Sequence, residues 1–174
     1  GEMGWSARNS VQIALFDAAD DLALRLEAYP IEGLVLGGVL YASVGERAAN
    51  VKDRYEADLR LERGPFLLQA EYIRAHDVNR TGTPVDAQGF YAAVAWTFRD
   101  VLQPGLRVGY LDPDVDRDLD PTAPSGRDEV WHFDVGINYY VRRHEAKLQL
   151  VYSRFQYDDR AAGDEVLLGA QVSF

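Results

Sequence analysis

The sequence predicts an all-β protein, an antiparallel β-barrel of about ten strands, on three observations. Apolar residues recur at every second position over most of the chain, which is the period of a strand with one apolar and one polar face. Turn residues separate these segments at short, regular intervals, as in barrels and sandwiches. Almost none of the 174 residues are left over for a helix.

The alternation is strongest in the segments 55–62, 130–140 and 165–174. A helix over 55–62 would scatter the apolar residues around its axis, so a strand is the better interpretation. In 130–140 one parity holds only large apolar or aromatic side chains, and the other holds mainly polar or small ones. The large ones are Trp131, Phe133, Val135, Ile137 and Tyr139.

Extended over the whole chain, the same pattern gives the strands in order. They are expected at 6–16, 21–30, 33–44, 53–63, 65–75, 88–99, 105–111, 129–141, 144–157 and 165–174. The parity of 33–44 is ambiguous, because Gly37 and Gly38 interrupt it. These strands form one domain over residues 1–174.

The connections between these strands alternate in length. Short ones fall at 30–33, 64–65, 100–104 and 141–144, and longer polar ones at 45–52, 77–87, 112–128 and 158–164. Only the first link, 17–20, is short where a long one is expected. Outer-membrane barrels have short periplasmic turns and long outer loops, whereas a soluble meander has no reason to keep its long loops at one end.

The contents of the two faces also favour a membrane barrel. A soluble barrel turns its apolar side chains inward, and a membrane barrel turns them to lipid. Here the apolar parity carries aromatic residues near strand ends, as at a membrane–water boundary. They are Trp5, Phe66, Tyr72, Phe90, Trp96, Phe98, Trp131, Tyr139 and Tyr152. The alternative is a soluble ligand-binding barrel, in which Phe133, Val135 and Ile137 would face inward.

Composition narrows the class further. The longest stretch without a charged residue has 13 residues, 33–45, whereas a transmembrane helix needs about 20 apolar ones. The formal charge of −10 argues against a nucleic-acid partner. The chain has no cysteine, which excludes disulfides and cysteine-ligated metals, and we expect no cofactor. No signal peptide is recognisable, so we expect that it was removed or that the chain starts within a longer protein.

The chain ends on Phe174, after apolar residues at alternate positions. A terminal aromatic residue on the last strand resembles the assembly signal that the barrel-insertion machinery reads in outer-membrane barrels. The alternative is an ordinary amphipathic edge strand that stops at a phenylalanine. As an assembly signal, Phe174 would lie in the periplasm, and the four longer loops would lie outside.

Several segments together resemble the phosphate-selective porins of the porin O/P family. Gly64-Pro-Phe-Leu-Leu-Gln-Ala-Glu-Tyr-Ile73 is similar to the family's Gly-Pro-Phe-Ser-Leu-Gln-Gly-Glu-Tyr, and Gly136-Ile-Asn-Tyr-Tyr140 to its Gly-Leu-Asn-Trp-Tyr. The closing 167–174 and Gly4-Trp-Ser-Ala-Arg8 fit less specifically. The resemblance covers most of residues 60–174.

The resemblance implies a barrel of about 16 strands, about twice as long as this chain, often trimeric, that passes anions such as phosphate. The chain would then be the C-terminal portion of such a barrel, or a shorter relative. Phosphate selectivity is not carried over, because the family's lumenal Arg and Lys residues lie mainly in the part of the barrel that this chain lacks and are not matched to positions here. The expected lumen is of mixed sign and, if anything, favours cations.

The polar parity supplies the residues expected to line the lumen. They are Arg25, Glu27, Glu56, Asp58, Arg60, Glu71, Arg107, His132, Asp134, Asn138, Lys147 and Gln149. The sequence therefore predicts a porin-like channel for passive diffusion in a bacterial outer membrane. Ten strands closing on themselves would instead leave little open lumen and make a non-conducting structural barrel or a subunit of a membrane complex. Expected partners are outer-membrane lipids, lipopolysaccharide, the assembly machinery and further copies in a homotrimer.

Two groups of residues invite a chemical interpretation. His132 and Asp134 share a strand face, but no Gly-x-Ser-x-Gly motif accompanies them, so we expect a lumenal hydrogen-bonded pair and no enzyme. The acidic run Asp112, Asp114, Asp116 and Asp118 has the alternate spacing of calcium loops. It lacks the glycine and glutamate of an EF-hand, so a solvated acidic loop is the main expectation and a calcium site the lesser one.

Overall fold

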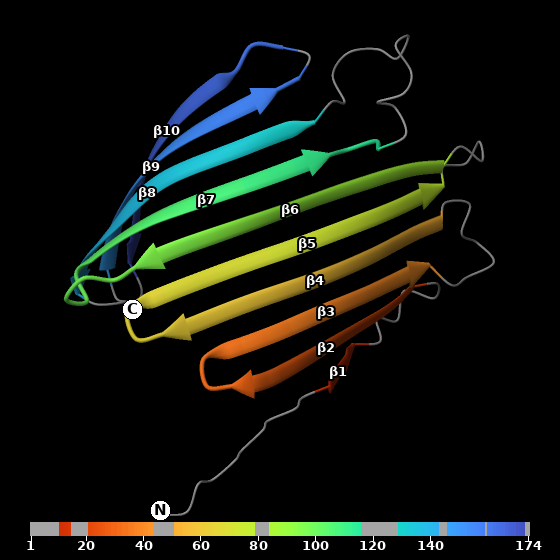
Figure 1. The fold of residues 1–174 in the computed structure, drawn as a ribbon, viewed down its shortest axis with the longest axis horizontal. Coiled ribbons are helices and arrows are strands. Elements are labelled where there is room, and N and C mark those ends of the chain that lie inside the picture. Colours follow the sequence, from red (N-terminus) through yellow and green to blue (C-terminus); the bar gives the residue numbers. More distant parts are fainter. Residues whose placement is uncertain are drawn as a thin grey trace, which may run out of the picture.

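The computed structural model describes residues 11–14, 21–43, 51–78, 84–115, 129–142, 146–158 and 160–172. Ten antiparallel strands form one sheet, and each strand pairs with its neighbours in sequence (Figure 1). The strands are β1 (Val11–Ala14), β2 (Asp21–Ile31), β3 (Leu34–Ser43), β4 (Val51–Arg63), β5 (Phe66–Val78), β6 (Pro84–Trp96), β7 (Leu102–Asp112), β8 (Val130–Arg142), β9 (Ala146–Tyr157) and β10 (Gly163–Val172). This meander confirms the predicted all-β fold.

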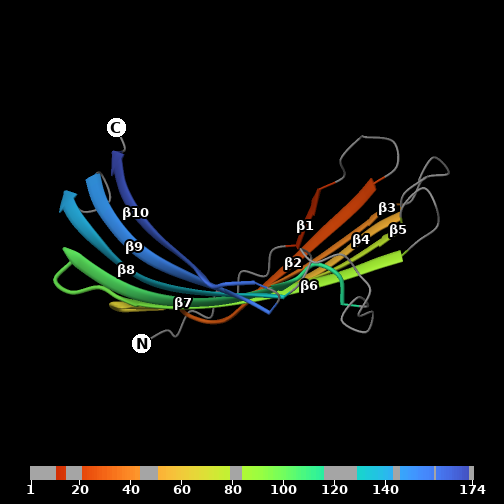
Figure 2. The same ribbon diagram turned by 90° about the horizontal axis from the view of Figure 1, so that it is seen from above.

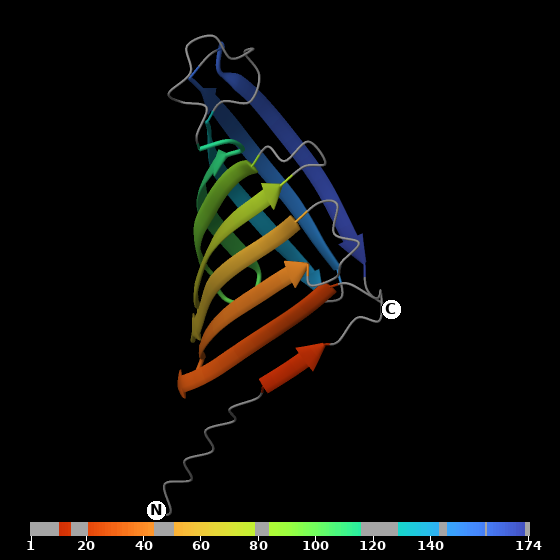
Figure 3. The same cartoon turned by 90° about the vertical axis from the view of Figure 1, so that its right-hand side faces the viewer.

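The sheet is curved into a trough (Figure 2). β1 and β10 lie at its two edges and are not paired with each other (Figure 3). Adjacent strands twist relative to one another, and this twist accumulates across a wide sheet. In the parts of the chain that the structure describes, the sheet therefore forms a curved wall with two open edges.

No helix among the described residues is long and apolar enough to span a membrane.

The short turns lie at one end of the sheet and the longer connections at the other (Figure 1). The turns at 32–33 and 64–65 contain Gly33 and Gly64, whose φ angles of 81° and 57° suit glycine. A Cβ at Gly33 would overlap the carbonyl oxygen of Glu62, whose amide donates a hydrogen bond to the Gly33 carbonyl. Glycine is thus required at this turn for both conformation and space.

Two connections differ from their predicted lengths. The loop expected over 77–87 shrinks to 79–83, because the polar residues 76–78 and 84–88 continue the ladder between β5 and β6. The turn between β6 and β7 spans 97–101, where Arg99 and Asp100 adopt positive φ angles of 52° and 58°. Phe98, expected within a strand, therefore makes only an isolated bridge to Leu102. The difference in length between these two connections is therefore smaller than the sequence predicts.

The convex face is apolar and uncovered. No hydrophobic side chain among the described residues is buried, and Val135 and Leu168 are 56% and 78% exposed. Phe133, Val135 and Ile137 share this face, as expected for a membrane barrel. So large an apolar surface is not stable in water, and a lipid environment accounts for it.

Two aromatic bands border this apolar face. Toward the long loops, Tyr72, Phe90, Tyr110 and Trp131 are direct partners across four strands. The ring centroids of Phe90 and Tyr110 lie 5.6 Å apart, and those of Tyr110 and Trp131 lie 5.0 Å apart. Toward the short turns, the Trp96 ring lies 6.3 Å from Phe66 and 6.4 Å from Phe98. Aromatic girdles at both interfaces are typical of outer-membrane barrels.

Between the two bands lies a row of aliphatic partners, Leu68, Val94, Leu106 and Val135.

We expect Val135→Arg to lower the free energy of unfolding from lipid vesicles by about 2–4 kcal/mol, because it places a charge near the bilayer midplane. Denaturant titration in vesicles measures this. The matched control, Asn138→Arg on the opposite face of β8, is expected to change stability by less than about 1 kcal/mol. Equal effects of the two substitutions would contradict the assignment of the faces.

Candidate functional site

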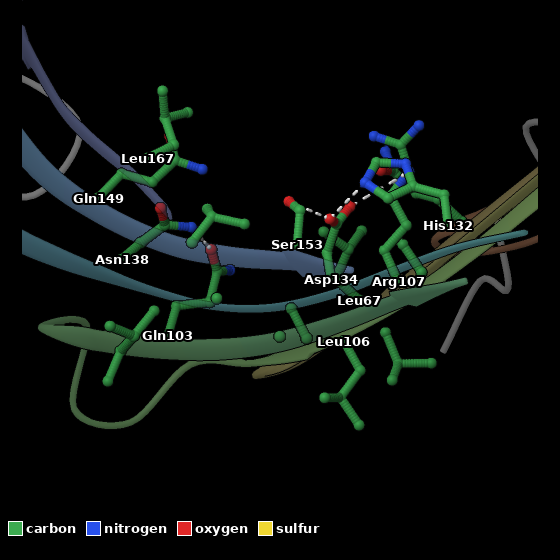
Figure 4. Close-up of a pocket in the computed structure, with 18 of the residues that line it drawn as sticks. Leu67, Gln103, Leu106, Arg107, His132, Asp134, Asn138, Gln149, Ser153 and Leu167 are labelled. Atoms are coloured by element: carbon green, nitrogen blue, oxygen red, sulfur yellow. Dashed lines mark hydrogen bonds and ion pairs between the residues drawn. The ribbon is translucent and has the colours of Figure 1, made fainter. Parts of the chain in front are cut away.

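The polar parity forms the concave face of the trough. The strand register places all twelve predicted lumen residues, from Arg25 on β2 to Gln149 on β9, on this one face. Figure 4 shows Asp134, Ser153 and Asn138 on one side of the sheet and Leu106 on the other. Nine of the twelve residues fall into three clusters that follow the strands across the face.

The first cluster, the arginine clamp, consists of Arg25, Glu27, Glu56 and Asp58. The Arg25 guanidinium meets three carboxylates: its Nε lies 2.8 Å from Glu27 Oε1, its Nη1 3.4 Å from Glu56 Oε1 and its Nη2 2.9 Å from Asp58 Oδ2. The Tyr29 hydroxyl donates a further hydrogen bond of 2.6 Å to Glu27 Oε2. All four clamp side chains are only partly exposed, by 19–34%. The clamp therefore joins β2 to β4 by charge-assisted hydrogen bonds.

Arg25 reaches Asp58 across the intervening strand β3. Gly37 of β3 stands opposite both Glu27 and Asp58 in the register. A Cβ at Gly37 would overlap the Asp58 carboxylate and lie 2.7 Å from Arg25 Nη2. Gly37, which makes the apolar alternation of this strand ambiguous in the sequence, thus leaves the space that the clamp occupies.

The second cluster is centred on Asp134 of β8 (Figure 4). The Ser153 hydroxyl donates to Asp134 Oδ1 at 2.6 Å, and His132 Nε2 lies 2.7 Å from the same oxygen. Arg107 Nε lies 3.9 Å from Asp134 Oδ2, and its guanidinium sits 4.9 Å from the centroid of the Tyr91 ring. Serine and histidine bind one carboxylate instead of each other, so this cluster is not the nucleophile–base pair of a hydrolase.

The third cluster is a run of amides nearer the short turns. Asn138 Nδ2 and the Tyr140 hydroxyl both donate to Gln103 Oε1, at 3.0 Å and 2.8 Å. Gln103 Nε2 donates in turn to Thr97 Oγ1 at 3.0 Å. Gln149 stands opposite Asn138 on the next strand. This cluster carries no formal charge and offers hydrogen-bonding groups to a solute.

The three remaining predicted residues lie on the same face beside these clusters. Glu71 stands opposite Asp58 and Tyr91, and Lys147 stands opposite Tyr140. Arg60 Nη2 pairs with Glu62 Oε1 at 2.8 Å, and both side chains are more than half exposed. Among the hollows on this face, one of about 470 Å³ opens beside Asp134 and the amides and one of about 400 Å³ beside the clamp.

Sequence reasoning missed six polar residues of these clusters. Tyr29, Tyr91 and Tyr140 supply hydroxyls or a ring face, and Ser153 and Thr97 supply hydroxyls. The sixth, Gln103, falls within the predicted short connection 100–104, yet β7 begins at Leu102. All of these residues except Thr97 have the same parity as the charged positions of their strands or pair with such positions. This parity is the signal in the sequence that could have identified them.

Two sequence predictions fall partly or wholly outside the described residues. Asp112 and Asp114 are buried, at 2% and 6% exposure, and the Asp114 amide donates to Asp112 Oδ1 at 3.2 Å. Asp116 and Asp118 lie outside the described part, and so does Phe174. Among the described residues no group of three or more metal-ligating side chains is found. The calcium interpretation and the assembly signal therefore stay predictions.

Comparison with known proteins finds a matching family model and similar solved structures. The family model of the phosphate-selective porins O and P matches residues 41–174. A solved porin structure, refined at 1.8 Å resolution, superposes with a TM-score of 0.63 at 17% sequence identity. The superposition covers 88% of this chain and 51% of that porin, so the chain spans about half the porin's length. No curated protein sequence matches significantly.

The close approach at Gly37 generates a stability prediction. We expect Gly37→Ala to lower the free energy of unfolding by about 1–2 kcal/mol, because the added methyl group separates Arg25 from Asp58. Denaturant titration of the refolded protein measures this change.

The neighbouring Gly38→Ala is the matched control for this prediction. A Cβ at Gly38 would meet only the Glu56 carbonyl oxygen, at an ordinary 3.6 Å, so a change below about 0.5 kcal/mol is expected. Equal destabilisation by the two substitutions would contradict the claim that Gly37 is needed to leave room for the clamp.

Proposed function

The chain belongs to the phosphate-selective porin O and P family, and from this premise we propose that it forms part of the wall of a pore for passive diffusion of small hydrophilic solutes or ions. Membership makes it an outer-membrane porin β-barrel protein of bacteria and not an enzyme. Our proposal concerns the passive passage of small hydrophilic solutes or ions through the pore.

The opposite polarity of the two faces is the observation that carries the proposal. The convex face offers aliphatic side chains between two aromatic bands, and the concave face offers three polar clusters. A soluble barrel has the reverse arrangement, with apolar side chains inside and charges outside. A wall that is apolar outside and polar inside suits a water-filled lumen surrounded by lipid.

The size of the sheet bears on whether a lumen stays open. A barrel of about eight strands is filled by its own side chains, whereas about 16–18 strands leave an aqueous channel. The ten strands described here have open edges, and they match about half of a porin. We propose that further strands complete the barrel. If the ten strands closed on themselves, the protein would instead be the non-conducting structural barrel that the sequence analysis gives as the alternative.

The convex face also defines the partners that we propose. Lipid chains would cover the aliphatic band, and lipopolysaccharide headgroups would meet the polar strand ends above the outer aromatic band. Recognition by the assembly machinery through the last strand and association into a homotrimer or larger complex remain predictions.

Selectivity for phosphate or other anions, which the family resemblance implies, is not part of this proposal. An anion site needs Arg or Lys donors that can face the solute. On the described wall the guanidinium of Arg25 is shared by three carboxylates, and that of Arg60 pairs with Glu62.

Conductance tests the proposed function. The full-length protein, purified in detergent and added to a planar lipid bilayer, is expected to give stepwise current increases that are linear in voltage. Protein that inserts, as shown by its resistance to protease in vesicles, and yet conducts no current would contradict the pore and support the structural barrel. Protein that stays in solution without detergent would contradict both.

A further inference from the structure

The concave face carries more negative than positive groups. Seven carboxylates lie on its described part between the two ends: Glu27, Glu56, Asp58, Glu62, Glu71, Asp134 and Glu165. Four cations share that area: Arg25, Arg60, Arg107 and Lys147. Toward the long loops, Lys52, Arg54 and Asp77 add one positive charge, which leaves the face acidic.

The three arginines between the two ends of this face lie against neighbouring side chains. Arg25 uses its Nε and both Nη atoms on the carboxylates of the clamp. Arg60 pairs with Glu62, and Arg107 lies between the Tyr91 ring and Asp134. A phosphate at Arg25 would compete with three carboxylates for the guanidinium donors, and it would meet their negative charge at close range.

The charge is most uneven beside the clamp. One guanidinium faces the three carboxylates of Glu27, Glu56 and Asp58, so the clamp keeps two formal negative charges. Glu71, directly opposite Asp58 on β5, adds a third negative charge at the same hollow of about 400 Å³, and Arg60, which also lines this hollow, offsets one of the three. A hollow with an excess of one sign of charge between low-dielectric walls focuses the field and concentrates ions of the opposite sign.

We propose that this acidic wall makes the pore favour small cations over phosphate and other anions, with Glu56, Asp58 and Glu71 as the residues that set the preference. Arg25 keeps the carboxylates together and is not available to anions. This inference rests on the proposed pore function, and it gives that pore a solute class opposite to the one in the family's name.

The permeability ratio of potassium to chloride tests this proposal. It is obtained from the reversal potential of the full-length protein in a planar bilayer with a KCl gradient. We expect a ratio above unity, and we expect added inorganic phosphate to leave the potassium current unchanged. Charge removal by the double variant Glu56→Gln/Asp58→Asn is expected to lower the ratio at least about twofold, because a change of about one kT in lumen potential alters both ion concentrations.

Two further variants keep the test decisive. Glu71→Gln removes one charge without touching the clamp, and it is expected to lower the ratio even if the double variant folds poorly. Asp164→Asn is the matched control: it removes the same charge from the convex face, where Asp164 accepts a hydrogen bond from the Tyr152 hydroxyl at 2.6 Å. The ratio is expected to stay at the wild-type value.

The outcomes separate this inference from the pore itself. A protein without conductance contradicts the proposed function. A conducting pore with a ratio below unity, or one blocked by phosphate, overturns the cation preference and leaves the pore standing. Equal shifts from Glu71→Gln and Asp164→Asn would also overturn it, because the effect would then not come from the lumenal wall.

Discussion

Consecutive side chains of a β-strand point to opposite faces, and in this sheet each face meets a different solvent. The described residues contain no buried hydrophobic core; hydrogen bonds between neighbouring strands and contact with lipid take its place. A shift of one residue in any register would turn Val135 and Ile137 toward the lumen and Asp134 toward lipid. The aromatic bands and the polar clusters both depend on this single alternation.

The polar clusters act across strands in the same way as the backbone ladder. The arginine clamp links β2 to β4 over Gly37, and Asp134 gathers groups from β7, β8 and β9. These contacts fix side chains of the concave face that would otherwise extend into water. They also engage the guanidinium groups of Arg25 and Arg107, which lie against carboxylates of neighbouring residues.

The strands and their two faces could be predicted from the sequence, because period-two alternation is a local property that the apolar residues display directly. The extension of β5 and β6 to Val78 and Pro84 could not, since those strand ends are as polar as a loop. The contact between Arg25 and Asp58 was also out of reach, because it depends on the register of three strands and on the space at Gly37. The parity of the sequence predicts which residues share a face of the sheet. Only the structure shows which of these residues are in contact.

The opposite polarity of the two faces is tested most directly at two adjacent positions of β8. The chain has no native cysteine, so Ile137→Cys and Asn138→Cys each give a single reporter thiol. The measurement is the rate of labelling by a water-soluble, membrane-impermeant thiol reagent in lipid vesicles. Fast labelling at 138 and protection at 137 is the predicted result. Fast labelling at 137 with protection at 138 would contradict a wall that is polar inside and apolar outside.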